Sequence, residues 1–305
     1  MTTQDKYNGI ITRTDGQRIW VEAGGVETPC ILRGRLKQER RFISTLAVIG
    51  DRVVMRTAGD GSGTIEEIAP RRSELARRVY FDQKWGRDHI MAANLDLLVN
   101  VQSAREPKFE PELAQRFLAL AHHGRMAGAI VINKCDLADE AELLQAAEAV
   151  RPFGVPVIMT SAVGGRGLAE LRALISGRLV ALVGRSGAGK SSLINALFPG
   201  FAIRTQEVGQ RTEKGRHTTT GSRLYPLPDG GYIADTPGLK DLLLFDAADE
   251  VAGAFPDIAE LARGCRFADC RHLAEPDCAV KAAVAAGDLP EARYRAYLKA
   301  ARLRR

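Results

Sequence analysis

The sequence predicts three structural units in one chain: a small all-β barrel, a central α/β domain with a mainly parallel sheet, and a C-terminal helical domain around a cysteine cluster. Short apolar runs separated by turn residues fill residues 8–68 and give about five strands. Buried strands then alternate with helical segments as far as residue 235. Three of the five cysteines lie within 14 residues near the C-terminus. The expected boundaries are 1–72, 73–245 and 246–305.

The composition fits a folded protein without a membrane segment. The chain has 305 residues and a hydrophobic fraction of 45%, which is enough for a buried core. It has no apolar run of about 18 residues, and its first residues, MTTQDKYNGI, lack an apolar signal core. We therefore expect a cytoplasmic protein that makes no membrane contact.

Positive charge is concentrated at both ends of the chain. The net charge is +6, with 14 Lys and Arg against 10 Asp and Glu in residues 1–80, and 7 against 2 in residues 281–305. Basic ends favour contacts with a polyanion such as nucleic acid. Ordinary solvated surface charge is the alternative.

The first unit fits a barrel of the oligonucleotide-binding (OB) type, and an SH3-like barrel fits almost as well. Between its third and fourth expected strands lies RGRLKQERR, residues 33–41, with five basic residues and one acidic residue. As a loop on such a barrel this segment can bind phosphates, or it is simply a solvated loop.

The central unit has the alternation of a doubly wound sheet, in which ligands bind at the C-terminal ends of the strands. The expected strands are 95–101, 127–133, 155–161, 178–184, 222–227 and 231–235, and the expected helices are 111–124, 139–150, 167–175 and 190–198.

A phosphate-binding motif follows one of these strands. GRSGAGKS fits G-x-x-x-x-G-K-[ST] between a strand and a helix, the context that the motif requires. Its glycines let backbone N–H groups and the helix N-terminus face phosphate oxygens. Lys190 is expected to contact the β- and γ-phosphates, and Ser191 to hold Mg²⁺. The expected phosphate-loop residues are Gly184, Arg185, Ser186, Gly187, Ala188, Gly189, Lys190, Ser191 and Ser192.

Two further segments are placed to complete the Mg²⁺ and γ-phosphate site. DTPG ends a strand, so that Asp235 can hold Mg²⁺ through water and Gly238 can bring a backbone N–H to the γ-phosphate. The polar segment 204–220 has no periodicity and ends in GRHTTT. Within it, Thr219 is favoured over its two threonine neighbours as an Mg²⁺ ligand, which would tie the order of this loop to the γ-phosphate.

NKCD, residues 133–136, predicts guanine specificity. Asp136 can accept hydrogen bonds from guanine N1–H and N2–H₂, which adenine does not offer. Asn133 can tether the loop to the phosphate loop, and the Lys134 stem can cover the base. The SA pair at the next strand tip can supply a backbone N–H to guanine O6. The expected base-binding set is Asn133, Lys134, Cys135, Asp136, Ser161 and Ala162.

The order of these motifs is unusual. A Ras-like GTPase has its phosphate loop first and its base reader last, whereas here NKCD and SA precede the phosphate loop, the threonine segment and DTPG. Because the ligand sits where several strand ends meet, the loops need only meet in space. The sequence therefore predicts a circularly permuted GTPase in which DTPG leads directly into the C-terminal unit. NKCD disfavours a kinase or an ATPase.

The C-terminal cysteines have the spacing of a zinc site. CRFADCRHLAEPDC gives Cys265-x₄-Cys270-x-His272-x₅-Cys278. Three thiolates and one imidazole suit tetrahedral Zn²⁺, and the protein fills all four positions, as in structural sites. Buried free thiols are the alternative.

The barrel, NKCD, TSA, GRSGAGKSS, GRHTTT, DTPG and the cysteine–histidine spacing together resemble ribosome small subunit-dependent GTPase A, the RsgA/YjeQ family, over essentially the whole chain. The resemblance implies a factor that hydrolyses GTP, with Mg²⁺, while bound to the small ribosomal subunit during its late maturation. It also implies a zinc-binding domain and rRNA contacts at the basic ends. We expect a monomer.

The resemblance implies slow unaided turnover, because Leu239 follows DTPG where Ras-like enzymes carry a water-orienting Gln. His217 is the candidate to orient water once the ribosome orders its loop, and an rRNA or structural contact is the alternative role. GTP is expected to tighten ribosome binding relative to GDP. An alternative function is an rRNA-binding assembly factor for which GTP is a regulatory ligand with little turnover.

Overall fold

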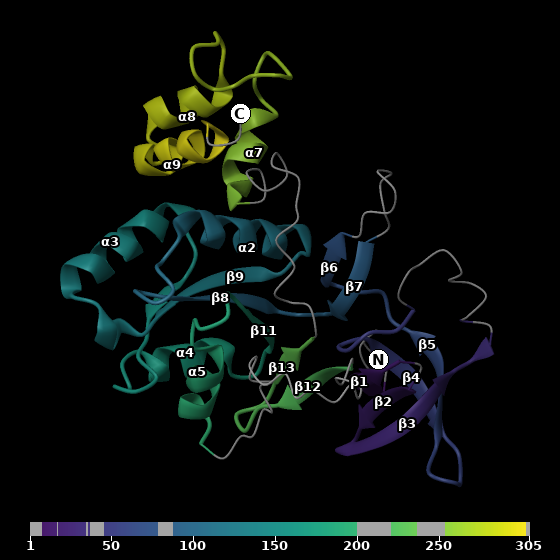
Figure 1. Ribbon diagram of the computed structural model, residues 1–305. Coiled ribbons are helices and arrows are strands. Elements are labelled where there is room, and N and C mark those ends of the chain that lie inside the picture. Colours follow the sequence, from purple (N-terminus) through teal and green to yellow (C-terminus); the bar gives the residue numbers. More distant parts are fainter. Residues whose placement is uncertain are drawn as a thin grey trace, which may run out of the picture.

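The computed structural model describes residues 8–16, 18–34, 36, 46–78, 88–199, 221–236 and 254–302. Three units are present: a barrel, a central sheet covered by helices on both faces, and a helical C-terminal unit above that sheet (Figure 1). His217, Thr219, Gly238 and most of the 33–41 segment lie outside the described residues. Among the helices described, none has the length and hydrophobicity needed to span a membrane.

The barrel has the OB-type order. It consists of β1 (Gly9–Asp15), β2 (Arg18–Ala23), β3 (Val26–Leu32), β4 (Arg52–Thr57) and β5 (Gly63–Ile68). These strands are ordered β1-β2-β3-β5-β4, with β3 and β5 parallel, and β4 pairs back onto β1 to close the barrel. Fully buried side chains such as Ile11, Val21 and Ile65 alternate with more solvent-exposed positions, as expected for strands with one buried face.

The central sheet is parallel where the motifs lie. β8 (Leu97–Ser103), β9 (Ala127–Asn133), β10 (Val157–Met159), β11 (Leu179–Val183) and β13 (Tyr232–Asp235) are ordered β10-β9-β8-β11-β13, and each neighbouring pair is parallel. Every residue of β8 and β11 is buried, the pattern required of strands covered on both faces. The strands therefore bring the ends of β9, β11 and β13 to one edge.

Helices cover the two faces of this sheet in pairs. α2 (Pro111–His123) and α3 (Glu140–Val150) lie on one face, and α4 (Leu168–Ile175) and α5 (Lys190–Leu197) on the other (Figure 1). The short 3₁₀ helices η2 (Cys135–Leu137) and η3 (Arg151–Phe153) follow β9 and α3. An Asp139–Glu142 capping box begins α3, which explains why acids lead this helix.

β12 (Ser222–Pro226) joins the central sheet to the barrel. It pairs antiparallel with β13 on one side and with β1 on the other, which gives one continuous sheet of 11 strands. The contact with β1 is close, since a Cβ atom at Gly221 would lie 2.6 Å from the Thr14 carbonyl oxygen.

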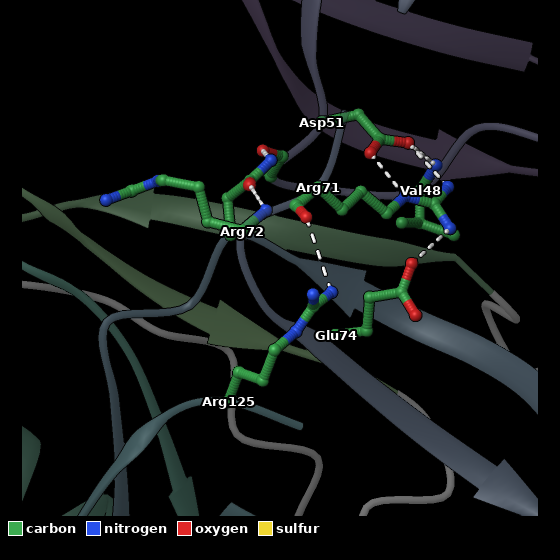
Figure 2. Close-up of polar contacts among 8 residues, drawn as sticks. Val48, Asp51, Arg71, Arg72, Glu74 and Arg125 are labelled. Carbon is green, nitrogen blue, oxygen red and sulfur yellow. Dashed lines mark hydrogen bonds and ion pairs between the residues drawn. The ribbon is translucent and has the colours of Figure 1, made fainter. Parts of the chain in front are cut away.

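A buried ion pair makes a second junction between the barrel and the rest of the chain. Asp51 is fully buried and accepts hydrogen bonds from Arg71 Nε at 2.7 Å and Nη2 at 2.9 Å, and from the Val48 N–H at 2.9 Å (Figure 2). The Arg71 side chain is 7% exposed, and Nη1 also lies 3.5 Å from Glu74. Arg125 Nη2 donates to the Arg71 carbonyl at 3.4 Å (Figure 2).

This second junction uses a hairpin that the sequence pattern did not predict. β6 (Glu74–Arg78) and β7 (Asp88–Ala93) form a separate two-stranded sheet. The apolar run at 46–50 packs against it and makes only an isolated bridge, Ile49 to Ala92. Gly50 ends that run at φ 86°, and a side chain there would lie 2.0 Å from the Ala93 carbonyl oxygen.

The C-terminal unit shares a core with the central domain. It contains α7 (Pro256–Ala262), α8 (Ala279–Ala286) and α9 (Glu291–Arg302). Phe255 is fully buried, and its ring packs edge-to-face with the rings of Phe153 and Tyr297. The distances between ring centroids are 5.6 Å and 5.7 Å. Arg293 pairs with Asp257 through two nitrogens and donates to the Pro152 carbonyl, so one guanidinium fastens α9 to α7 and to the central domain.

Replacing Asp51 with Ala should lower the free energy of unfolding by about 3–5 kcal/mol, because the buried Arg71 guanidinium would lose its partner. Denaturant unfolding followed by circular dichroism measures this change. Asp60→Ala, at an exposed turn of the same barrel, is the matched control and should have a much smaller effect. Equal stability of the Asp51 variant and the wild type would contradict a structural role for the pair.

Candidate functional site

The NKCD loop is tied to two neighbouring segments by hydrogen bonds. Asn133 Nδ2 donates to the Ala188 carbonyl of the phosphate loop at 3.0 Å, and Thr160 Oγ1 donates to Asn133 Oδ1 at 3.1 Å. The Cys135 N–H donates to the Thr160 carbonyl at 3.1 Å. Asn133 and Thr160 are 1% and 0% exposed, so water does not compete for these bonds. The loop is therefore fixed relative to both the phosphate loop and the end of β10.

Asp136 is exposed but held in one orientation. Ser161 Oγ donates to Asp136 Oδ1 at 2.5 Å, and the Gly164 N–H donates to Ser161 Oγ at 2.8 Å. The Ser161 hydroxyl thus orients the carboxylate without neutralising it. A carboxylate that is already oriented can accept the two donors on the guanine edge with little further ordering.

The other base-loop residues have different positions. Lys134 takes a left-handed conformation at φ 59°, and its Nζ donates to the Glu106 carbonyl at 2.6 Å. Cys135 instead faces the core: it is 5% exposed, its Sγ donates to the Ile132 carbonyl, and burial raises its pKa. The Cys135 side chain therefore packs away from the ligand side, and Ala162 packs half-buried against the core beneath α4 and α5.

The phosphate loop between β11 and α5 requires its glycines. Gly184, Gly187 and Gly189 have φ values of 147°, 81° and 87°, a region that other residues rarely adopt. A side chain at Gly184 would lie 2.0 Å from the Val101 carbonyl oxygen, and one at Gly189 would lie 2.3 Å from Asn133 Nδ2. The loop can follow this path only because these side chains are missing.

Lys190 lies inside the curve of this loop. Its Nζ donates to the carbonyl oxygens of Gly184 at 2.7 Å and Arg185 at 2.9 Å. The ammonium group therefore stands beside the N-terminus of α5, where N–H groups and the helix dipole favour an anion. Ser191 and Ser192 occupy the first turn of the same helix, and Ser186 lies on the exposed part of the loop.

A loop that the motifs did not predict flanks the phosphate loop. Arg185 forms an ion pair with Glu110, at the N-terminus of α2. Gln102 fixes the Glu110 backbone, with Oε1 accepting from its N–H at 3.0 Å and Nε2 donating to its carbonyl at 3.1 Å. One feature of the sequence could have indicated this loop: two amide side chains, Asn100 and Gln102, lie inside an otherwise apolar strand.

The Mg²⁺ ligands can be traced only in part. Asp235 is the last residue of β13, which pairs in parallel with β11 through Ala181 and Ala234. Its exposed carboxylate therefore lies beside the strand that leads into the phosphate loop. A serine hydroxyl from Ser191 and a carboxylate are oxygen donors of the kind that Mg²⁺ prefers. Thr219, His217 and Gly238 lie outside the described residues, so their roles stay predictions.

The cysteine cluster has the dimensions of a tetrahedral zinc site. The ligand atoms of Cys265, Cys270, His272 and Cys278 all lie within 4.8 Å of one another. Zn–S and Zn–N bonds of about 2.3 and 2.0 Å require S···S near 3.8 Å and S···N near 3.5 Å. The Cys265–Cys278 sulfur distance is 3.8 Å, and His272 Nδ1 lies 3.5 and 3.4 Å from the same two sulfurs. The residues therefore fit Zn²⁺ bound through Nδ1.

Neighbouring groups orient the ligands of this cluster and shift their pKa values. Burial lowers the pKa of His272, which keeps the imidazole neutral as a ligand must be. Partial burial and the neighbouring thiols raise the pKa of Cys270 to about 11, whereas hydrogen bonds outweigh desolvation and lower the pKa of Cys265. The Lys281 N–H at the start of α8 donates to Cys278 Sγ at 3.5 Å, and Tyr294 Oη donates to the His272 carbonyl.

Comparisons with known proteins agree with this geometry. The model of the RsgA GTPase family matches residues 68–245. The chain belongs to the RsgA GTPase family. It is 45% identical to the small ribosomal subunit biogenesis GTPase RsgA of Gemmatimonas aurantiaca over 271 residues, which cover 88% of this chain and 87% of that one. It is 40% identical to the protein of the same name from Moorella thermoacetica over 291 residues, or 95% and 94% of the two chains.

Solved structures give the same result for the fold. The crystal structure of YjeQ from Thermotoga maritima superposes with a TM-score of 0.73 at 31% identity and covers 96% of both chains. That of YloQ, described as a circularly permuted GTPase, gives a TM-score of 0.67 at 30% identity, covering 96% of this chain and 93% of YloQ. The predicted RsgA resemblance and the three-part fold with permuted order are therefore confirmed.

The Asp136→Asn variant should bind GTP at least about 100-fold more weakly, because the amide cannot accept both guanine donors. It should gain affinity for xanthosine triphosphate, whose C2 carbonyl accepts a hydrogen bond from the new amide. Calorimetric titration measures the affinity for both nucleotides. Asp139→Asn, at the exposed start of α3, is the control. Unchanged GTP affinity in the Asp136 variant would remove this residue from base recognition.

Zinc analysis should find about one Zn²⁺ per chain, and Cys270→Ala should lose it. The loss should destabilise the C-terminal unit locally, because the barrel and the central sheet have cores of their own. Cys30→Ala, at a buried thiol of the barrel, should keep its zinc. Stoichiometric zinc in the Cys270 variant would show that another set of ligands holds the metal.

Proposed function

We propose that this protein hydrolyses GTP to GDP and phosphate while bound to the small ribosomal subunit, during biogenesis of that subunit. One observation carries the proposal: the oriented carboxylate of Asp136, the ammonium of Lys190 and the carboxylate of Asp235 come from separate strand ends to one edge of the sheet. Relatives that match nearly the whole chain are named small ribosomal subunit biogenesis GTPases.

The residues at this edge divide the work of binding and catalysis. Asp136 and the end of β10 select guanine, and the phosphate-loop amides with Lys190 stabilise negative charge that develops on the phosphates. Ser191 and Asp235 would hold Mg²⁺, which neutralises charge on the β- and γ-phosphates when bound. We assign Thr219 to the same metal and Gly238 to the γ-phosphate.

Activation of the attacking water is assigned to the ribosome-bound state. Leu239 follows DTPG, and an apolar side chain cannot orient water as Gln does. We propose that turnover is slow without the subunit and that His217 orients the water when the subunit orders segment 204–220. We therefore expect a low rate of GTP hydrolysis by the protein alone and a higher rate when the small subunit is bound.

The partner contacts follow from charge and architecture. We propose that the basic barrel and the basic tail contact rRNA, that the protein acts as a monomer in the cytoplasm, and that its units divide near residues 72 and 245. Since phosphate contacts dominate such binding, affinity for the subunit should fall steeply with salt.

Multiple-turnover phosphate release, measured with and without purified small subunits, tests the proposal. Wild-type turnover should rise on adding small subunits and stay unchanged with large subunits. Lys190→Ala should lower stimulated turnover by about 100- to 1,000-fold, because it removes charge stabilisation of the transition state. Subunit binding without turnover would instead support the alternative in which GTP is only a regulatory ligand.

A further inference from the structure

The loop between β8 and α2, residues 104–110, lies between the two loops that are assigned to the ends of the nucleotide. In the sheet, β8 stands between β9, which leads into the NKCD loop, and β11, which leads into the phosphate loop. The three strands are parallel, so their C-terminal ends lie along one edge of the sheet, where ligands bind. A GTP molecule with its guanine at the end of β9 and its phosphates at the end of β11 therefore has its ribose over the end of β8.

One peptide unit of this loop contacts both neighbouring loops. The Glu106 carbonyl accepts a hydrogen bond from Lys134 Nζ of the NKCD loop at 2.6 Å. On the other side, a Cβ atom at Gly187 of the phosphate loop would lie 3.7 Å from Pro107 Cδ, which is ordinary van der Waals contact. The Glu106–Pro107 peptide therefore lies between the base end and the phosphate end of the site.

Hydrogen bonds fix this loop at both of its ends. Ser103 is fully buried, and its Oγ accepts hydrogen bonds from the N–H groups of Arg105 at 3.3 Å and Glu106 at 3.1 Å. At the other end, both amide groups of the Gln102 side chain bind the backbone of Glu110. A side chain on the loop can therefore bind a ligand with little further loss of conformational entropy.

Glu106 carries the carboxylate of this loop that is not engaged by the protein. Arg105 Nη2 lies 3.8 Å from Glu142. Glu110 forms an ion pair with Arg185. Glu106 is exposed, and within the described part of the chain neither a hydrogen bond nor an ion pair engages its carboxylate. This carboxylate is therefore available to a ligand at the end of β8.

A carboxylate at this position fits the hydroxyl groups of a ribose. The 2′- and 3′-hydroxyls are neighbouring donors, and an ionised carboxylate has two oxygens that only accept. A carboxylate at the end of a parallel strand binds the ribose of a dinucleotide in the same way in the Rossmann fold. Lys108, two residues further along the loop, has an ammonium group that only donates, so it offers the hydroxyl protons no acceptor.

We propose that Glu106 is a specificity-determining residue that binds the ribose hydroxyls of GTP and selects guanine ribonucleotides over deoxyribonucleotides. Asp136 then reads the base, Glu106 reads the sugar and Lys190 binds the phosphates, in the order of the strands β9, β8 and β11. The inference rests on the proposed function, because it takes GTP as the ligand. It adds a residue that belongs neither to NKCD nor to the phosphate-loop motif.

The test measures the affinity of the full-length protein for GTP and for 2′,3′-dideoxyGTP, which lacks both hydroxyls, by calorimetric titration. The wild type should bind GTP about 5- to 30-fold more tightly, a modest ratio because water competes for an exposed carboxylate. Glu106→Ala should lose this preference through weaker binding of GTP, with unchanged affinity for the analogue. Glu106→Gln should keep part of it, because the amide oxygen still accepts one hydroxyl. Glu148→Gln, at an α3 side chain that is 47% exposed, is the control and should behave as the wild type.

The outcomes separate this inference from the proposed function. Equal affinity of the wild type for both nucleotides, or the same preference in the wild type and in Glu106→Ala, overturns ribose recognition by Glu106 and leaves the function standing. An equal loss of affinity for both nucleotides in Glu106→Ala overturns it as well, because the residue then acts only by positioning Lys134. Failure of the wild type to bind either nucleotide overturns the proposed function itself.

Discussion

The hydrogen bond from Asn133 to the Ala188 carbonyl is the contact on which the nucleotide site depends. It joins the base-reading loop of β9 to the phosphate loop of β11, although β8 lies between the two strands and 55 residues separate the two bonded positions in the sequence. Because both groups are buried, the bond sets a fixed distance between the guanine end and the phosphate end of the site. The permuted chain order does not disturb this arrangement, since the strand neighbours and the strand ends stay the same.

The remaining architecture limits where nucleotide-dependent motion can occur. The barrel is fastened twice, by the β1–β12 pairing and by the buried Asp51–Arg71 ion pair. The C-terminal unit shares an apolar core with α2 and α3, with Phe255 at its centre. A rigid swing of either unit would break buried contacts.

Local chemistry decided how much could be predicted from the sequence. The phosphate loop, NKCD, DTPG and the zinc ligands were predictable because each function needs fixed residue types at fixed short spacings. Thr160, Gln102 and Glu110 were not, because Thr160 meets Asn133 only when β9 and β10 pair. Gln102 and Glu110 reach Arg185 of the phosphate loop only when β8 and β11 pair. The β6–β7 hairpin and the β1–β12 pairing were missed for the same reason, since contacts between distant segments leave no local periodicity. Cys135 was predicted to bind the base because it lies within the NKCD motif. Its side chain faces the core instead, and the motif alone does not show this.

The most direct measurement is a crystal structure of the protein with Mg²⁺ and a non-hydrolysable GTP analogue. One nucleotide should span the edge of the sheet, with guanine N1 and N2 on the Asp136 carboxylate and the phosphates along residues 184–191. The Asn133–Ala188 hydrogen bond should stay intact beneath the ligand. A nucleotide whose base lies away from Asp136, or whose phosphates lie outside the loop at 184–191, would contradict a single site built from permuted motifs.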